Sequence, residues 1–237
     1  MSGGESSTRE PGVSVTEQCH PTTGENHSDD YLGLADAWLR EYVAVADRRV
    51  GRSGPVCPFM PRALDQHAVE ARIRYDIDGS SEQELINELG AEISDFGSAG
   101  RPSGKSGVLL DSRLIVMPQL GPAGWERLDA AYAHLKAFAV ELGLMVGQFH
   151  PRCDERAVRN SDFRVSVAPV AMLAIRHMAP HDILFLHGSE RWFKEYDSHF
   201  RSHFERGRIR DSLLLSLYAG ARDRSADDSG AGQSSAR

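Results

Sequence analysis

Large apolar residues recur along the middle of the chain with the spacing of helices that bury one face. In the stretch 122–142 they fall every three or four positions, at Trp125, Leu128, Tyr132, Leu135, Phe138 and Leu142, and Gly143 follows as a stop signal. A second stretch opens with a capping box from Ser81 to Glu84 and continues with Leu85, Ile86, Leu89 and Ile93. The pattern predicts two helices that pack on a common core.

Short apolar runs of the length of buried strands lie between the helical stretches, at 69–77, 108–118, 145–149, 165–170 and 172–178. Further helices are expected at 29–50, from Ser189 to Phe204 and at 208–220. The polar stretch 151–163 is predicted to be a loop with a helical turn near 155–158. Because strands and helices interleave, the predicted class is α/β or α+β, with a single mixed β-sheet flanked by helices.

The two ends of the chain have a different composition from the rest. Residues 1–30 and 223–237 are rich in Gly, Ser, Asp and other small or polar residues, and almost no large apolar side chain interrupts them. Such segments bury too little surface to offset the entropy of ordering. We therefore expect a disordered N-terminal arm at 1–30, a single globular domain at 31–222 and a disordered C-terminal tail at 223–237.

Charge and cysteine content narrow the classes of partner and compartment. The formal net charge of −7 argues against nucleic acid as a partner. The three cysteines, Cys19, Cys57 and Cys153, form no spaced disulfide framework, which fits a reducing cytosol. The sequence has no signal-peptide pattern and no apolar run of about 20 residues, so we expect a cytoplasmic protein without membrane contact.

The most informative feature is the end of the strand predicted at 145–149. His150 follows the apolar run and precedes Pro151, which favours an extended backbone at the histidine. A histidine fixed at a strand end is well placed to act as an acid, a base or a metal ligand near neutral pH. We therefore treat His150 as the leading candidate for chemistry.

A second pair of candidates lies inside the apolar strand predicted at 172–178. Arg176 and His177 are costly to bury without partners. One interpretation is structural: Arg176 pairs with a carboxylate, such as Asp154, Asp162 or Asp182, and His177 bonds to the backbone. The other is functional: the two strands lie together and present His150, Arg176 and His177 at one pocket.

Two other kinds of site are weaker alternatives. Cys57 and Cys153 could join His150 in a zinc site, but structural zinc sites usually show paired ligands at two places and only one half is present here. A cysteine–histidine nucleophile pair is also conceivable, although Cys57 lies among prolines, where a small buried thiol is the more common outcome.

Three short motifs, in this order, resemble a known group of proteins. They are Cys57-Pro58-Phe59, Phe149-His150-Pro151 and the run from Pro169 to Met178. Together they resemble an uncharacterised-domain family of actinobacterial biosynthetic clusters. That family is in turn similar to the YqcI/YcgG group, which includes haem-dependent enzymes that oxidise amino or guanidino nitrogens of amino acids. The resemblance covers roughly residues 31–205.

The resemblance implies a haem-dependent oxygenase of specialised metabolism. Its substrate would be a small amino acid or amine, and it would need O₂ or peroxide and a reductant. His150 would be the axial iron ligand, as histidine is in many haem proteins. Arg176 and His177 would be the catalytic pair, and Arg176 would also hold a carboxylate. The remaining wall of the cofactor site would be Met145, Phe149, Met172 and Ile175.

The alternative from another class is a cofactor-free accessory or small-ligand-binding protein of a biosynthetic cluster. In that interpretation the same strands form only a core and a small cleft. The sequence leaves a homodimer open in both cases.

Overall fold

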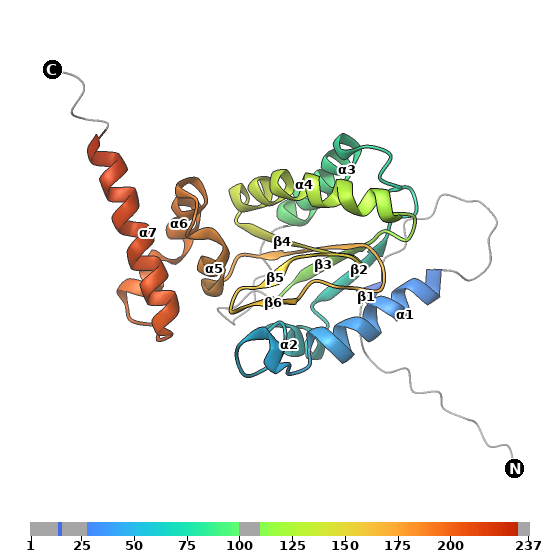
Figure 1. Cartoon of the computed structure of the whole chain (residues 1–237), viewed down its shortest axis with the longest axis horizontal. Coiled ribbons are helices and arrows are strands. Elements are labelled where there is room, and N and C mark those ends of the chain that lie inside the picture. The colour runs from blue at the N-terminus through green and yellow to red at the C-terminus, as the bar shows by residue number, and fades with distance from the viewer. Residues whose placement is uncertain (1–13, 16–27, 100–109, 232–237) are drawn as a thin grey trace, which may run out of the picture.

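The computed structural model describes residues 14–15, 28–99 and 110–231, and in this part of the chain a five-stranded mixed sheet lies between helices (Figure 1). The strand order is β1-β2-β3-β7-β4. The strands are β1 (Ser14–Val15), β2 (Val69–Ile73), β3 (Ser112–Val116), β4 (Leu144–Phe149) and β7 (Met172–His177). β1, β2 and β3 are parallel, and β7 runs antiparallel to both of its neighbours, β3 and β4. The predicted mixed sheet flanked by helices is confirmed, in the α+β class.

Helices cover both faces of the sheet. On one face lie α1 (Ser28–Trp38), which continues as a π-helical turn at Leu39–Val43, then a 3₁₀ turn at Arg48–Val50 and α2 (Met60–Asp65). On the other face lie α3 (Glu82–Ser98) and α4 (Pro122–Glu141). A separate helical group follows β7 in the chain: a 3₁₀ turn at Pro180–Asp182, α5 (Ile183–Leu186), α6 (Glu190–Glu205) and α7 (Ser212–Ala231).

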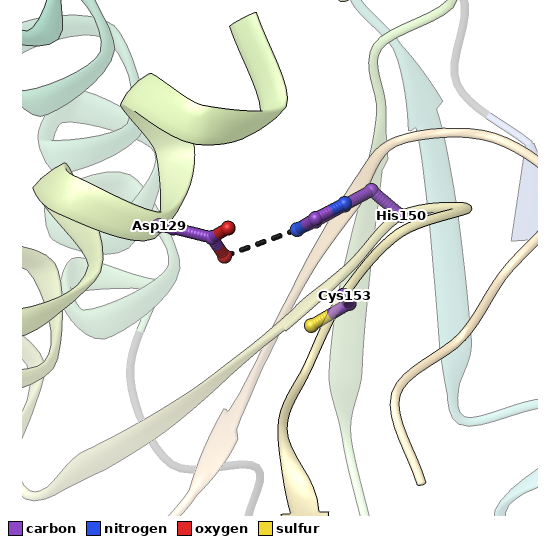
Figure 2. Close-up of side chains that lie close together, drawn as sticks. All are labelled: Asp129, His150 and Cys153. Atoms are coloured by element: carbon purple, nitrogen blue, oxygen red, sulfur yellow. Dashed lines mark hydrogen bonds and ion pairs between the residues drawn. The ribbon is translucent and has the colours of Figure 1, made fainter. Parts of the chain in front are cut away.

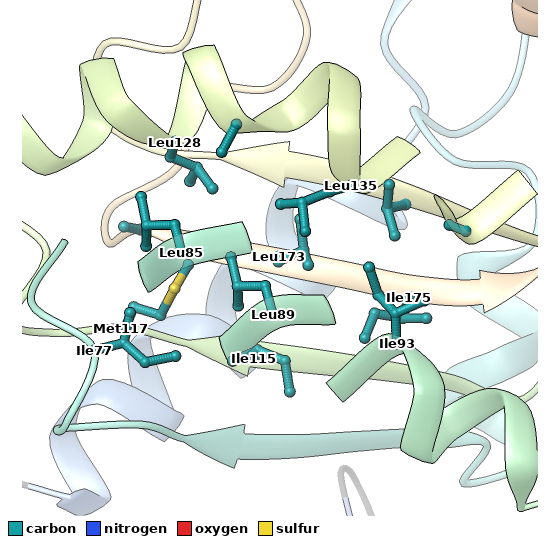
Figure 3. Packing of buried hydrophobic residues seen from close by; sticks show 14 of the residues in the cluster. Ile77, Leu85, Leu89, Ile93, Ile115, Met117, Leu128, Leu135, Leu173 and Ile175 are labelled. Carbon is teal, nitrogen blue, oxygen red and sulfur yellow. The ribbon is translucent and has the colours of Figure 1, made fainter. Parts of the chain in front are cut away.

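The main core lies between the sheet and the pair α3–α4 (Figure 3). The capping box at Ser81 and Glu84 opens α3 as predicted, with the Glu84 N–H donating to Ser81 Oγ at 3.1 Å. From α4, the core-facing residues are Leu128, Ala131, Leu135 and Ala139. The small alanines let the helix approach the sheet closely.

The apolar stripe predicted for 122–142 is therefore only partly correct. Leu128 and Leu135 are buried, but Phe138 and Leu142 are 37% and 45% exposed. Trp125 and Tyr132 are half-buried beside the core. The prediction followed large residues and passed over the alanines, whose positions define the face that packs.

Several boundaries differ from the sequence-based expectation. The first helix is shorter than 29–50, because it ends at Trp38 and its π-helical continuation at Val43. The stretch 151–163 contains a second, two-stranded sheet, β5 (Arg156–Ala157) with β6 (Asn160–Arg164), instead of a helical turn. This hairpin is anchored through backbone groups, for example by Asn160 Nδ2, which donates to Arg49 O at 2.7 Å.

The ends also differ from the expected arm and tail. β1 pairs in parallel with β2, so part of 1–30 joins the sheet edge, and α7 continues to Ala231, beyond the predicted end of the domain at 222. The remainder of the predicted arm and tail, 1–13, 16–27 and 232–237, lies outside the described residues. Among the helices of the described part, none combines the length and apolar character that crossing a bilayer requires.

Candidate metal centre

A tight turn at the end of β4 brings two metal-binding side chains together. The turn runs from His150 to Cys153 and is closed by the Cys153 N–H, which donates to His150 O at 3.1 Å. Pro151 occupies the second position of the turn, where its fixed φ is favourable. The turn thus explains how the spacing H-x-x-C places the imidazole and the thiol next to each other.

Helix α4 supplies the third side chain. Trp125, Asp129 and Tyr132 are four and then three positions apart, so they share one face of the helix. The Tyr132 hydroxyl donates to Val146 O at 3.0 Å, which fixes this face against β4. Asp129 is thereby carried to the strand end, where its Oδ1 lies 3.0 Å from His150 Nε2 (Figure 2).

The three side chains form a compact group of different donor types. One ligand atom each of Asp129, His150 and Cys153 lies within 4.8 Å of the others. His150 and Cys153 are buried, with 1% and 0% of their surface exposed, whereas the Asp129 side chain is 44% exposed. The group therefore has a buried floor and opens to solvent at the carboxylate.

Gln148 lies within the same group. Its Nε2 donates to Asp129 Oδ1 at 2.8 Å, so the same carboxylate oxygen is within hydrogen-bond distance of both Gln148 and His150. Within this group, Gln148 Oε1 and His150 Nδ1 are buried and have no hydrogen-bond partner among the described residues. Buried orphan atoms are rare in folded proteins because each costs about 1–3 kcal/mol.

The thiol of Cys153 is not a ready nucleophile. Burial raises its pKa to about 11, so at neutral pH it carries its proton. Reactive cysteines need a lowered pKa, in an electropositive and partly exposed setting. A bound cation would replace the proton, which makes this thiol better suited to a metal than to covalent catalysis. Cys57 lies elsewhere, packed against the apolar cluster on the α1–α2 face.

The structure does not bring His150, Arg176 and His177 to one pocket. His177 pairs with Leu144 at the start of β4, whereas His150 follows its end, six positions later. At about 3.3 Å per residue the two histidines are roughly 20 Å apart along the strand. Arg176 and His177 also point to opposite faces, because successive side chains alternate: Arg176 lies over Phe59, and His177 contacts Phe96 of α3.

Arg176 fulfils the structural interpretation. Its guanidinium bonds both oxygens of Asp182, at 2.6 and 2.8 Å, and Asp182 also accepts the Ala179 N–H at 2.7 Å. Burial acts to lower the pKa of Arg176, but the Asp182 carboxylate outweighs it, so the pKa is raised and the arginine stays charged. The predicted ion pair is confirmed, with Asp182 as the partner.

The other residues predicted to form a cofactor wall are also divided between the faces. Phe149 and Met172 belong to the cluster on the α1–α2 face, where Phe149 meets Trp38 edge-on. Ile175 belongs to the cluster under α3 and α4. Met145 packs with the C-terminal helices. The four side chains are core residues of three different clusters.

These residues do not fit a haem at His150. An axial histidine needs its Nε2 directed into open space, but this atom faces Asp129, and the imidazole stacks on Trp125 with ring centroids 5.8 Å apart. A cavity of about 230 Å³ is lined by residues that include Arg113 and His177, at the other end of the sheet, and His150 is not among them. Ligand pockets for larger molecules usually span several hundred Å³.

Sequence reasoning missed Asp129 and Gln148. A weak signal for Asp129 was its position four residues after Trp125 and three before Tyr132, on the face of the helix that borders the apolar stripe. For Gln148 the signal was a polar residue inside an otherwise apolar strand.

Comparison with known proteins places the chain in a family but gives it no function. No curated protein and no solved structure matches it. The model of one family, described as a domain of unknown function (DUF6875), matches residues 33–211, which include every residue of the candidate metal centre. The chain therefore belongs to the DUF6875 family.

Proposed function

We propose that this protein is a metal-dependent enzyme that binds one zinc-type divalent ion through Asp129, His150 and Cys153 and acts on a small molecule at the open coordination position. The observation that carries the proposal is the convergence of these three ligands within 4.8 Å from two separate elements. Three protein ligands with a fourth position left for water or substrate are the arrangement of catalytic zinc sites.

The donor set favours zinc over the common hard cations. Mg²⁺ and Ca²⁺ take oxygen ligands, whereas a thiolate, an imidazole and a carboxylate together suit zinc. In a tetrahedral zinc site, neighbouring ligand atoms lie about 3.5 Å apart, given bond lengths near 2.0–2.3 Å. A span of at most 4.8 Å between the three ligand atoms closes to this distance by small side-chain movements.

The surrounding residues already hold the ligands in place. Gln148 orients the Asp129 carboxylate through its 2.8 Å hydrogen bond, as outer-shell partners of metal ligands commonly do. Trp125 supports one face of the His150 ring. A zinc ion in this place would supply Lewis acidity, either to polarise a substrate oxygen or to lower the pKa of a bound water.

Metal titration of the full chain tests the proposal. After removal of metal with a chelator, the protein should bind one equivalent of Zn²⁺ or Co²⁺, and Co²⁺ should give a thiolate-to-metal charge-transfer band. Cys153→Ser should abolish the band, and His150→Ala should weaken binding at least about a hundredfold. Cys57→Ser is the matched control and should leave both unchanged. A full Co²⁺ band in Cys153→Ser would overturn the proposal.

The haem-dependent oxidation of a nitrogen that the resemblance implies stays a prediction, and the same preparations test it. Haem added to metal-free protein should produce no Soret band that depends on His150, because Asp129 and Trp125 occupy the space around its ring. A stoichiometric Soret band that His150→Ala removes would favour the haem enzyme and contradict the zinc site.

A further inference from the structure

An arginine stands beside the candidate metal centre, in the turn that holds two of its ligands. Arg152 lies between His150 and Cys153 in sequence, and its side chain is 57% exposed. Its guanidinium carbon lies over the Trp125 ring, 5.2 Å from the ring centroid. The same indole stacks with His150, with an angle of 24° between the ring planes. The indole thus fixes the position of the guanidinium relative to the metal ligands.

The hydrogen-bonding capacity of Arg152 is not used by a close acidic partner. Its ion pair is with Glu126 at 3.7 Å, longer than a hydrogen bond, and the Glu126 side chain is 76% exposed. By contrast, Arg176 and Arg113 bond carboxylates at 2.6 and 2.7 Å. Arg152 is therefore a guanidinium with loosely engaged donors, held on the same indole that contacts His150.

The chemistry of Arg152 and of the neighbouring metal ligands indicates a class of ligand. A guanidinium binds a carboxylate through two parallel hydrogen bonds, a geometry that fits few other groups. The exposed edge of the metal site, at Asp129, would admit a second donor atom of the same molecule to the open coordination position. A carboxylate with an oxygen donor on the neighbouring carbon can satisfy both at once.

We propose that the site binds a small carboxylate, with Arg152 holding the carboxylate group and the metal ion taking the neighbouring donor. This inference rests on the proposed metal site. Arg152 is then a substrate-binding residue, and Trp125 is the positioning residue that holds its guanidinium in place.

Co²⁺-loaded protein provides the test, because its visible absorption reports directly on the coordination sphere. Lactate should shift the spectrum in a saturable manner, and lactamide, which has the same shape without the charge, should bind at least about tenfold more weakly. Arg152→Ala should reduce lactate affinity by at least about tenfold without changing Co²⁺ stoichiometry. Arg152→Lys should keep part of the affinity, since it retains the charge and loses the fork.

Arg156→Ala is the matched control for charge. Arg156 is also exposed and close in sequence, but it is bonded to Asp154 at 2.6 Å, so its removal should leave lactate binding unchanged. Equal binding of lactate by Arg152→Ala and the wild type would overturn the carboxylate inference while the metal site stands. Failure of the wild type to bind Co²⁺ at all would overturn the metal site and the inference that rests on it.

Discussion

The two ends of the β4–β7 strand pair carry similar polar residues but differ in how their polar atoms are bonded. At the end near His177, which we call the ion-pair end, Arg176 is matched by Asp182, and Arg113 by Glu70 and Asp95. At the end near His150, the metal-site end, buried Gln148 Oε1 and His150 Nδ1 lack partners among the described residues. Charges that are paired with opposite charges indicate a structural role. Buried polar atoms without hydrogen-bond partners, next to side chains that can bind a metal, indicate a binding site.

This difference also separates stability from binding. Substitutions at the ion-pair end should lower the free energy of unfolding and leave metal affinity intact. Substitutions at the metal-site end should lower the metal affinity and leave the free energy of unfolding nearly unchanged.

Arg113→Ala should destabilise the fold by about 3–5 kcal/mol. Arg113 is 4% exposed and donates charge-assisted hydrogen bonds to Glu70 and Asp95. Its loss breaks these bonds, although both carboxylates keep Arg72 as a partner. Chemical denaturation measures the loss. Arg156→Ala, which removes an exposed pair, should cost less than about 1 kcal/mol. Equal costs for the two variants would remove the structural role assigned to the ion-pair end.

Arg176→Ala should cost about 2–3 kcal/mol of unfolding free energy. The fully buried Asp182 loses its counter-charge but keeps the hydrogen bond from Ala179, which moderates the effect. The double variant Arg176→Met, Asp182→Asn should recover part of the loss, because no uncompensated charge remains. Metal affinity should not change in either protein, and a drop of tenfold or more would show that the two ends are coupled.

The affinity for zinc should rise with pH through the neutral range. The Cys153 thiol, with a pKa of about 11, holds a proton in the metal-free protein, and the metal-bound thiolate does not. Binding therefore releases this proton at every pH below 11, so the affinity increases by up to about tenfold per pH unit. Competition titrations with a chromogenic chelator at several pH values measure the slope. A flat profile would exclude Cys153 as a ligand.

Gln148→Ala should weaken zinc binding by about tenfold while Cys153 and His150 stay in place. The glutamine touches Asp129 and would hold this ligand in its orientation. Gln148→Glu offers a sharper comparison, because a second carboxylate beside Asp129 should restore or increase the affinity for a cation. If both variants bind zinc as the wild type does, Gln148 has no part in the site.

How much the sequence could predict depends on whether a feature is local. The fixed position of His150 follows from its neighbours alone, and so do the capping box of α3 and the ends of α4. The contact with Asp129 depends on how α4 packs against β4, through alanines and the Tyr132 hydroxyl, which no local pattern contains.

The prediction that Arg176 and His177 face one pocket is wrong for a reason that is itself local. Strand alternation alone places neighbouring residues on opposite faces, so a shared pocket was excluded by a rule that sequence reasoning already had. The distance between His150 and His177 was different, because it required the antiparallel register of β4 and β7. Register is set by long-range pairing and was not readable from either strand alone.

X-ray absorption at the zinc edge is the most direct test of the metal centre. The full chain loaded with one equivalent of Zn²⁺ should show one sulfur ligand at about 2.3 Å and nitrogen or oxygen ligands near 2.0–2.2 Å, and Cys153→Ser should lose the sulfur contribution. A wild-type spectrum with nitrogen and oxygen ligands only, or a sulfur contribution that survives in Cys153→Ser, would contradict the site built from Asp129, His150 and Cys153.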